Sequence, residues 1–282
     1  MSHLKHIALL GAKGMLGSDL SAIAAGRGHV VNRLDLPAFD ITRPEHVEQA
    51  AADCDVIINC AAYTNVEKAE SEPDAACKVN AEAVGRLGDI AKTHDKPVLH
   101  ISTDFVFDGT LDRPYVETDT PHPISAYGLS KWRGEQALAA SGCRHAIIRV
   151  EWTYGRHGVN FIEKLLAAAR AGKPLRVVDD QVGAPTATTT VSEAICDLLA
   201  GGVPEGVFHL AADEYVSRYG MAQFMFDTLD MRVDLSPCKT SDFPSAAQRP
   251  LNSRFDCSKI EAALGRPLEH WKESLGRYLG HR

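Results

Sequence analysis

Residues 6–17 read HIALLGAKGMLG, and this stretch decides the fold. The apolar run 6–10 has the length of a strand, and helical spacing of apolar residues follows over 14–26. Glycines between a first strand and a helix let the backbone approach a pyrophosphate, which then meets the free N–H groups at the helix start. A glycine-rich turn without a ligand is the alternative. We predict a dinucleotide-binding turn formed by Gly11, Lys13, Gly14, Met15, Leu16 and Gly17.

Further apolar runs of strand length follow along the first half of the chain. They lie at 29–34, 55–60, 97–102 and 145–150. Between them, helical patterns occur at 74–94 and after Pro44. Alternating strands and helices predict a parallel sheet covered by helices on both faces. The predicted fold class is therefore α/β, with a Rossmann-type doubly wound parallel sheet in a dinucleotide-binding domain over residues 1–150.

The alternation loosens after residue 150. The patterns predict helices at 160–171, 190–200, 217–229 and 270–280, and strands near 175–178 and 206–210. We expect residues 151–282 to form a smaller mixed α/β portion that mainly binds substrate. Some of its segments are expected to return to the main sheet.

Composition excludes several classes of protein. The 282 residues carry a formal net charge of -7 and no long Lys/Arg run, so nucleic acid is not expected as a partner. No apolar stretch approaches the ~18 residues of a membrane span, and residues 1–11 do not read as a signal peptide. The seven cysteines have irregular spacing and no CxxC pair, which indicates reduced thiols and no metal site. We expect a cytoplasmic protein.

Acidic residues near the end of the second strand bear on the choice of cofactor. Asp35 is placed to accept hydrogen bonds from an adenosine ribose and to repel a 2′-phosphate, which favours NADH. Arg33 could instead meet a 2′-phosphate, so NADPH stays open, and Asp35 could also be a solvated loop acid. Asp40 and Ile41 are predicted to flank the adenine.

Tyr127 and Lys131 are four residues apart in SAYGLSKWRGE (125–135), so one helix places both on the same face. An ammonium beside a phenol favours the phenolate, which would lower the tyrosine pKa toward neutrality. Such a tyrosine can give a proton to a ketone oxygen as hydride arrives. Thr103, at the end of strand 97–102, could donate to the same oxygen, or simply cap a turn. A surface Tyr/Lys pair is the alternative.

Taken together, these residues resemble the extended short-chain dehydrogenase/reductase superfamily, whose triad is Ser/Thr, Tyr and Lys. The closer resemblance is to the dTDP-4-dehydrorhamnose reductase family, and it extends along nearly the whole chain. The stretches that resemble this family are AAYTNVEKAESEP (61–73), VNAEAV (79–84), STDFVFDG (102–109), YGLSK (127–131), VDDQVGAPT (178–186) and RPLNSRFD (249–256).

The resemblance implies reduction, by NADH or NADPH, of the C4 ketone of a nucleotide-linked 6-deoxyhexulose, most closely dTDP-4-dehydro-L-rhamnose. It implies Thr103, Tyr127 and Lys131 as catalytic residues. It adds cofactor contacts from Ala61, Ala62, Tyr63, Asn80, Tyr127 and Lys131. It implies substrate contacts from Asn65, Val66, Thr103, Asp104, Phe105, Tyr127 and Trp152. Arg249 could meet the substrate pyrophosphate, or form a surface ion pair.

Three positions depart from related patterns. Related dehydratases have an Asp-Glu pair after the threonine, whereas this chain keeps Asp104 and has Phe105 in place of the base. A phenyl ring cannot remove a proton, so a reductase is expected, with Phe105 either walling the sugar pocket or packing in the core. Glu151 replaces a small polar residue, which could alter the pocket. Met15 stands where some members bind magnesium through an acid.

Other functions remain open on the sequence. They are another nucleotide-sugar 4-ketoreductase, an epimerase with tightly held NAD, and a non-catalytic dinucleotide-binding subunit of the kind that serves methionine adenosyltransferase. A homodimer is a further expectation.

Overall fold

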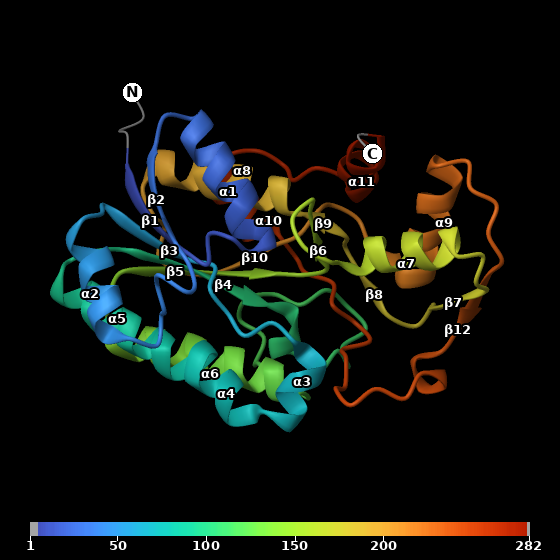
Figure 1. Ribbon diagram of the computed structural model, residues 1–282, viewed down its shortest axis with the longest axis horizontal. Helices are drawn as coiled ribbons and strands as arrows, with labels where there is room; N and C mark the ends of the chain where they lie inside the picture. Colours follow the sequence, from blue (N-terminus) through green and yellow to red (C-terminus); the bar gives the residue numbers. More distant parts are fainter. Residues whose placement is uncertain (1–4, 281–282) are drawn as a thin grey trace.

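Six parallel strands form the central sheet of this computed structural model, which describes residues 5–280 (Figure 1). The spatial order is β2-β1-β3-β4-β5-β10, and every neighbouring pair is parallel. The strands are β1 (His6–Leu10), β2 (Val30–Leu34), β3 (Val56–Asn59), β4 (Val98–Thr103), β5 (His145–Val150) and β10 (Gly206–Leu210). The predicted Rossmann-type α/β fold is confirmed. Residues 1–4, part of the segment in which no signal peptide was expected, lie outside the described residues.

Helices cover both faces of the sheet because its strands are apolar on both sides. In β1, Ile7 and Leu9 face one buried cluster while Ala8 and Leu10 face another. The first cluster lies under the helices drawn above the sheet in Figure 1, which are α1 (Met15–Gly26), α8 (Thr188–Gly201) and α10 (Ser258–Leu264). The second cluster lies on the opposite face, between the sheet and the helices drawn below it in Figure 1. These are α2 (Pro44–Ala52), α5 (Ala83–Thr93) and α6 (Ala126–Ser141). This two-sided burial agrees with the continuous apolar strands.

The chain order of the strands reverses at β1. β2 lies on one side of β1, and β3 and all later strands lie on the other. In open α/β sheets, ligands bind outside the carboxyl ends of the strands at such a switch point. The site is therefore expected where the loops after β1 and β3 meet.

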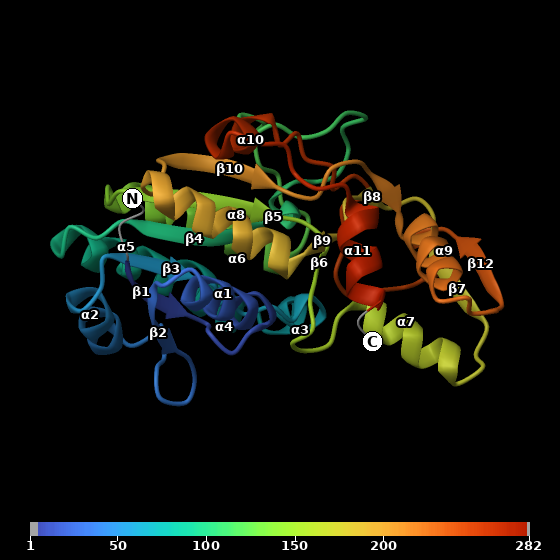
Figure 2. The same ribbon diagram turned by 90° about the horizontal axis from the view of Figure 1, so that it is seen from above.

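The second half of the chain adds a smaller unit beyond these carboxyl ends, and the strand arrows point toward it in Figure 2. Its buried cluster contains Ile162, Met225, Trp271 and Leu275. The elements are β6 (Thr153–Tyr154), α7 (Phe161–Arg170), β7 (Leu175–Val178), β8 (Val182–Gly183), β9 (Thr186–Ala187), β11 (Val216–Ser217), α9 (Arg218–Thr228), β12 (Leu235–Cys238) and α11 (Trp271–Gly280). Meanwhile α8, β10 and α10 pack on the main sheet. The domain boundary at residue 150 stays a prediction.

A buried ion pair joins α6 to the sheet. The Arg149 guanidinium in β5 donates to both carboxylate oxygens of Glu135, at 2.6 and 3.0 Å, and both side chains are only 2% exposed. Ser102 in β4 donates a further hydrogen bond to Glu135, at 2.5 Å. Arg149 also lies over the Phe107 ring, at 5.1 Å. Because Tyr127 and Lys131 are on α6, this pair holds their helix against the sheet.

Over residues 5–280, no helix combines the length and apolar character needed to cross a membrane. All seven cysteines are free thiols.

Candidate active site

The glycine turn after β1 meets the loop after β3 at very short range. Gly11 has φ +74, and a Cβ there would lie 2.6 Å from the Ala61 backbone nitrogen. A Cβ on Gly17 would collide with the Gly11 carbonyl oxygen. Glycine is therefore required at both positions. Helix α1 starts at Met15 after Gly14, whose position gives no side-chain cap, so its first N–H groups have no side-chain acceptor. This is the arrangement that a pyrophosphate completes.

Two cations and one acid meet where the turn passes the end of β2. Asp35 accepts hydrogen bonds from the backbone nitrogens of Lys13 and Leu36, both at 2.7 Å. Lys13 Nζ donates to the Leu36 carbonyl oxygen at 2.7 Å, and Arg33 donates weakly to the Ala12 carbonyl oxygen at 3.4 Å. Asp35 thus helps to fix the turn, and Lys13 and Arg33 bring two positive charges to the same turn.

Asn80 ties the loop after β3 to α6. Its Oδ1 accepts from the Tyr63 nitrogen at 2.8 Å, and its Nδ2 donates to the Tyr63 carbonyl oxygen at 3.0 Å and to Ser130 Oγ at 2.9 Å. Ser130 in turn donates to the Tyr127 carbonyl oxygen at 2.7 Å. Asn80 lies in a π-helical turn, Lys78–Glu82, between α4 (Pro73–Cys77) and α5. Such turns are frequent at functional sites.

The predicted cofactor contact of Asn80 is thereby reinterpreted. Its side chain is fully buried, and its amide bonds to protein groups on three sides. Asn80 is placed to position the 61–63 loop and the catalytic helix, rather than to reach a ligand directly.

We expect Asn80→Ala to lower turnover by about 10-fold or more and to raise the KM for the cofactor, because one buried amide holds both loop and helix. Steady-state kinetics with the cofactor varied would measure both effects. Asn32→Ala, at an exposed position of the edge strand β2, is the matched control and should leave them unchanged. Equal kinetics for the Asn80 and Asn32 variants would show that the linkage has no functional role.

The start of α6 is held from two sides. Ser125 caps the helix by accepting from the Gly128 nitrogen at 3.1 Å, and Glu70 accepts from the Ala126 nitrogen at 2.8 Å. Glu70 belongs to the short helix α3 (Val66–Ser71). Tyr127 therefore lies between two anchored residues, Ala126 and Gly128, which fixes its backbone.

Lys131 is buried against β4. Its Nζ donates to the Ile101 carbonyl oxygen at 2.7 Å and lies 3.2 Å from His100 Nε2. Asn59 Oδ1 accepts from the Ala61 nitrogen, so its Nδ2 faces His100 Nδ1, at 3.0 Å. Nδ1 must then accept, which places the imidazole proton on Nε2, toward Lys131. Burial lowers the pKa of Lys131 to about 8. Burial therefore weakens the preference of Lys131 for its charged form, but an amine with this pKa is still mainly an ammonium at neutral pH.

The predicted activation of Tyr127 is wrong for the protein alone. Burial and the nearby Asp104 charge raise the pKa of Tyr127 above its ordinary value, although a hydrogen bond with Thr103 opposes them. The phenol therefore keeps its proton at neutral pH. Proton donation to a ketone oxygen needs a protonated phenol, so this state suits the reducing direction.

Thr103 and Asp104 end β4 beside this tyrosine. Thr103 Oγ1 donates to Asp104 Oδ1 at 3.0 Å, and Ser253 Oγ donates to Asp104 Oδ2 at 2.5 Å. Burial raises the pKa of Asp104 despite these bonds. The structure thus brings Thr103, Asp104 and Tyr127 together at the carboxyl end of the sheet.

The other predicted substrate residues occupy different surroundings. The Phe105 ring is half-buried and lies edge-on to Tyr127, with centroids 5.5 Å apart, as a pocket wall would. Trp152 is half-buried, with an unusual backbone φ of +44. Asn65 caps α3 by accepting from the Lys68 nitrogen at 3.0 Å, and Val66 is the first helical residue.

Arg249 forms an ion pair with Glu67 of α3 and also donates to Ser245. Of the two interpretations of Arg249, the structure thus shows the ion pair. This contact joins the segment 245–249 to α3. At the adenine end, Asp40 accepts from Thr42 Oγ1 at 2.8 Å, and Ile41 is buried in the core. Asp40 therefore orders its own turn, and the predicted adenine contacts stay predictions.

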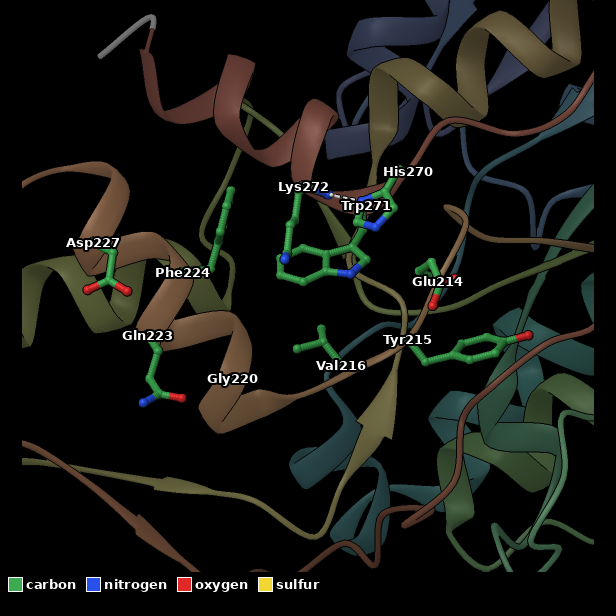
Figure 3. Close-up of a pocket in the computed structure, with 10 residues that line it drawn as sticks. All are labelled: Glu214, Tyr215, Val216, Gly220, Gln223, Phe224, Asp227, His270, Trp271 and Lys272. Atoms are coloured by element: carbon green, nitrogen blue, oxygen red, sulfur yellow. Dashed lines mark hydrogen bonds between the residues drawn. The ribbon is translucent and has the colours of Figure 1, made fainter.

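A hollow of about 470 Å³ lies between β11, α9 and the start of α11, and Figure 3 draws residues that line it. Trp271 and Lys272 project from α11 toward α9, while Tyr215 extends away from them. The ten residues drawn include none of the predicted site residues. Separately, residues 5–280 contain no group of three or more His, Cys, Asp or Glu side chains arranged to hold a metal ion.

Sequence reasoning missed Asn59, Glu70 and His100. Asn59 and His100 stand out as polar residues inside the apolar runs 55–60 and 97–102, which was an available signal. Glu70 gave no signal, because its partner Ala126 is 56 residues away.

A Rossmann sheet with a glycine turn at its switch point, and a Thr-Tyr-Lys set on β4 and α6, defines a reductase of the extended short-chain dehydrogenase/reductase type. Residues 5–282 match the family model described as RmlD substrate binding domain. The chain belongs to the dTDP-4-dehydrorhamnose reductase family.

Individual relatives agree with this assignment. The chain is 36% identical to a dTDP-4-dehydrorhamnose reductase of Sinorhizobium fredii, over 96% of this chain and 95% of the relative. It is also 36% identical to one of Mycobacterium tuberculosis, over 98% and 92%. A crystal structure of the Bacillus anthracis dTDP-4-dehydrorhamnose reductase in complex with NADP has a TM-score of 0.94 at 30% identity, covering 99% of this chain and 100% of that one.

Proposed function

We propose that this protein reduces the C4 ketone of a nucleotide-linked 6-deoxyhexulose, dTDP-4-dehydro-L-rhamnose, to dTDP-L-rhamnose with a nicotinamide cofactor. The single observation that supports this most directly is the grouping of Thr103, Asp104 and Tyr127 at the carboxyl end of β4, on the same edge of the parallel sheet as the glycine turn after β1. Family membership supplies the substrate class, since the relatives bear this activity in their names.

The residues divide the chemistry among them. The bound cofactor supplies hydride to the C4 carbon. Tyr127 donates its proton to the carbonyl oxygen, and its raised pKa keeps that proton in place until charge develops on the oxygen. Thr103 Oγ1 lies close enough to Tyr127 to polarise the same oxygen. Lys131 contacts His100 and the Ile101 carbonyl, and in this proposal its ammonium binds the ribose of the cofactor.

Phe105 accounts for the choice of reduction over dehydration. Elimination of water needs a base on the sugar, and the phenyl ring beside Tyr127 has no proton acceptor. A reductase needs only hydride and one proton, which the cofactor and Tyr127 provide.

Either NADH or NADPH suits the turn after β1. Asp35 favours an unmodified ribose, whereas Lys13 and Arg33 offer positive charge to a 2′-phosphate. The Bacillus anthracis relative was crystallised with NADP. We infer that NADPH is used at least as well as NADH. Lys13 and Arg33 can attract a 2′-phosphate, and the Asp35 carboxylate, which would repel it, already accepts hydrogen bonds from backbone nitrogens.

The test is an absorbance assay at the nicotinamide band, with freshly prepared dTDP-4-dehydro-L-rhamnose and each cofactor in turn. Oxidation of cofactor that depends on the keto-sugar, with dTDP-L-rhamnose as product, is the expected result. Absence of turnover with both cofactors would contradict the proposal. A strong preference for NADH would contradict only the inference about the ribose.

We further infer that the protein acts in the cytoplasm on this small molecule rather than on nucleic acid. The net charge of -7 supports a substrate other than nucleic acid. The expected homodimer stays a prediction.

A further inference from the structure

The Arg218 guanidinium is a half-buried cation without a hydrogen-bond partner among the described residues. Arg218 begins α9, directly after β11. Among residues 5–280, no acceptor forms a hydrogen bond with its side chain. The guanidinium lies over two aromatic rings, and nearby charged groups also act on it. Burial lowers the pKa of Arg218 to about 9, so the group is still charged at neutral pH. A guanidinium has five N–H donors, and in this half-buried position no described residue uses them, so they are available to a ligand.

Trp152 supports this guanidinium. The Arg218 Cζ lies 3.5 Å from the centroid of the indole, and 5.0 Å from that of the Phe161 ring. This stacking fixes the plane of the guanidinium and leaves its N–H edge free to donate. Trp152 itself has φ +44, a conformation that a bulky residue adopts at a cost and that is common at ligand sites. The backbone is thus strained at the residue that presents the platform.

A second unpartnered polar atom lies in the same cluster. Glu151 is 1% exposed; its Oε2 accepts from the Ala184 nitrogen at 2.9 Å, while its Oε1 has no partner among the described residues. A Cβ on Gly183 would collide with Oε2 and would lie 2.9 Å from the Trp152 ring. Burial, followed by the Asp104 charge, raises the pKa of Glu151 well above its usual range. Burial thus favours the protonated form of Glu151, which packs beside the platform.

The position of the cluster indicates which part of the substrate it meets. The carboxyl groups that act most on Arg218 are those of Asp104 and Glu151. Asp104 is bonded to Thr103 and is the charge that acts on Tyr127. Arg218 thus lies on the side of the reacting carbonyl. Arg249 is a second cation that acts on Arg218, but it is already paired with Glu67. A diphosphate beside Arg218 would face the Asp104 carboxylate, which disfavours it, whereas sugar hydroxyls are neutral and can both donate and accept.

We propose that Arg218, supported by Trp152 and Glu151, is a specificity-determining residue that donates hydrogen bonds to oxygen substituents of the sugar ring. This inference rests on the proposed function. The inference adds that the planar guanidinium of Arg218 selects the hydroxyl groups of the sugar ring, and that the diphosphate is bound elsewhere.

The test compares two ligands by isothermal titration calorimetry on protein saturated with NADP⁺. They are dTDP-L-rhamnose, which has the sugar, and dTDP, which lacks it. The variants are Arg218→Met, which keeps the length but removes the donors, and Arg218→Lys, which keeps the charge but loses the planar fork. Arg176→Met is the matched control, because Arg176 also lies over an aromatic ring, Phe243, but is exposed.

We expect Arg218→Met to weaken dTDP-L-rhamnose binding by about 10- to 100-fold, as for lost charge-assisted hydrogen bonds, and to leave dTDP binding within about 2-fold. Arg218→Lys should give an intermediate loss for the sugar nucleotide alone, and Arg176→Met no loss. Thermal unfolding of each variant would establish that it is folded.

Equal losses for the two ligands would overturn the proposal, because Arg218 would then meet the diphosphate. Unchanged binding of both by a folded Arg218→Met would also overturn it, since the residue would be purely structural. If the wild type bound neither ligand, the proposed function would fail and this inference with it. That outcome is distinct because it appears before any variant is tested.

Discussion

Replacing Tyr127 with phenylalanine is expected to lower turnover of the keto-sugar nucleotide by about 10²- to 10⁴-fold while cofactor binding is kept. The reason is geometric and electrostatic together. The phenol lies beside Thr103 and Asp104 at the carboxyl end of β4, and it keeps its proton because burial and Asp104 raise its pKa. Phenylalanine preserves the ring contact with Phe105, 5.5 Å between centroids, and removes only the proton donor.

Stopped-flow oxidation of the reduced cofactor would measure the rate, and cofactor fluorescence would measure binding. Tyr154→Phe is the matched control, because its hydroxyl bonds to Ser274 inside the C-terminal unit at 3.1 Å. A near-normal rate for Tyr127→Phe would remove the proton-donor assignment. Loss of cofactor binding at the same time would point to a structural role instead.

Replacing Arg149 with methionine is expected to lower the free energy of unfolding by about 3–5 kcal/mol. Methionine removes the partner of Glu135 and leaves that carboxylate buried with only the Ser102 hydroxyl. The pair is 2% exposed on both sides, so water cannot replace the lost contacts. The loss should also loosen α6, and turnover should fall with stability.

Equilibrium unfolding in urea would measure the change in the free energy of unfolding. The control is Arg43→Met, which breaks an exposed pair with Glu45 and should change stability by about 0–1 kcal/mol. The double replacement of Arg149 and Glu135 by apolar residues should recover part of the loss, because no buried charge would remain unpaired. A loss below about 1 kcal/mol for Arg149→Met alone would show that the pair contributes little.

Much of the fold follows from local pattern. The apolar run 6–10 and the glycines after it are contiguous, and they predicted β1, the turn and α1 nearly residue by residue. The two-residue strands, such as β8 and β11, were missed. Each is too short for a periodic pattern, and β8 pairs with β11 only because the chain returns to it about 34 residues later.

The candidate site was harder to predict where it depends on distant partners. Tyr127 and Lys131 are close in sequence, so helical spacing was enough to pair them. The pKa of Tyr127 was predicted in the wrong direction, because it depends on how deeply the phenol is buried and how near Asp104 lies. Arg218 was not singled out at all, since its platform Trp152 is 66 residues away and only the fold brings them into contact.

The π-helical turn at Lys78–Glu82 makes this enzyme sensitive to length as well as to residue type. Deleting one residue there would let the segment relax into an ordinary α-helix, and everything on one side would rotate by about 100° relative to the other. The Asn80 amide would then swing away from Tyr63 and Ser130, although each residue type was unchanged. Homologues that gain or lose a single residue in this turn should therefore have rebuilt the link between cofactor loop and catalytic helix, whereas surface loops can vary in length freely.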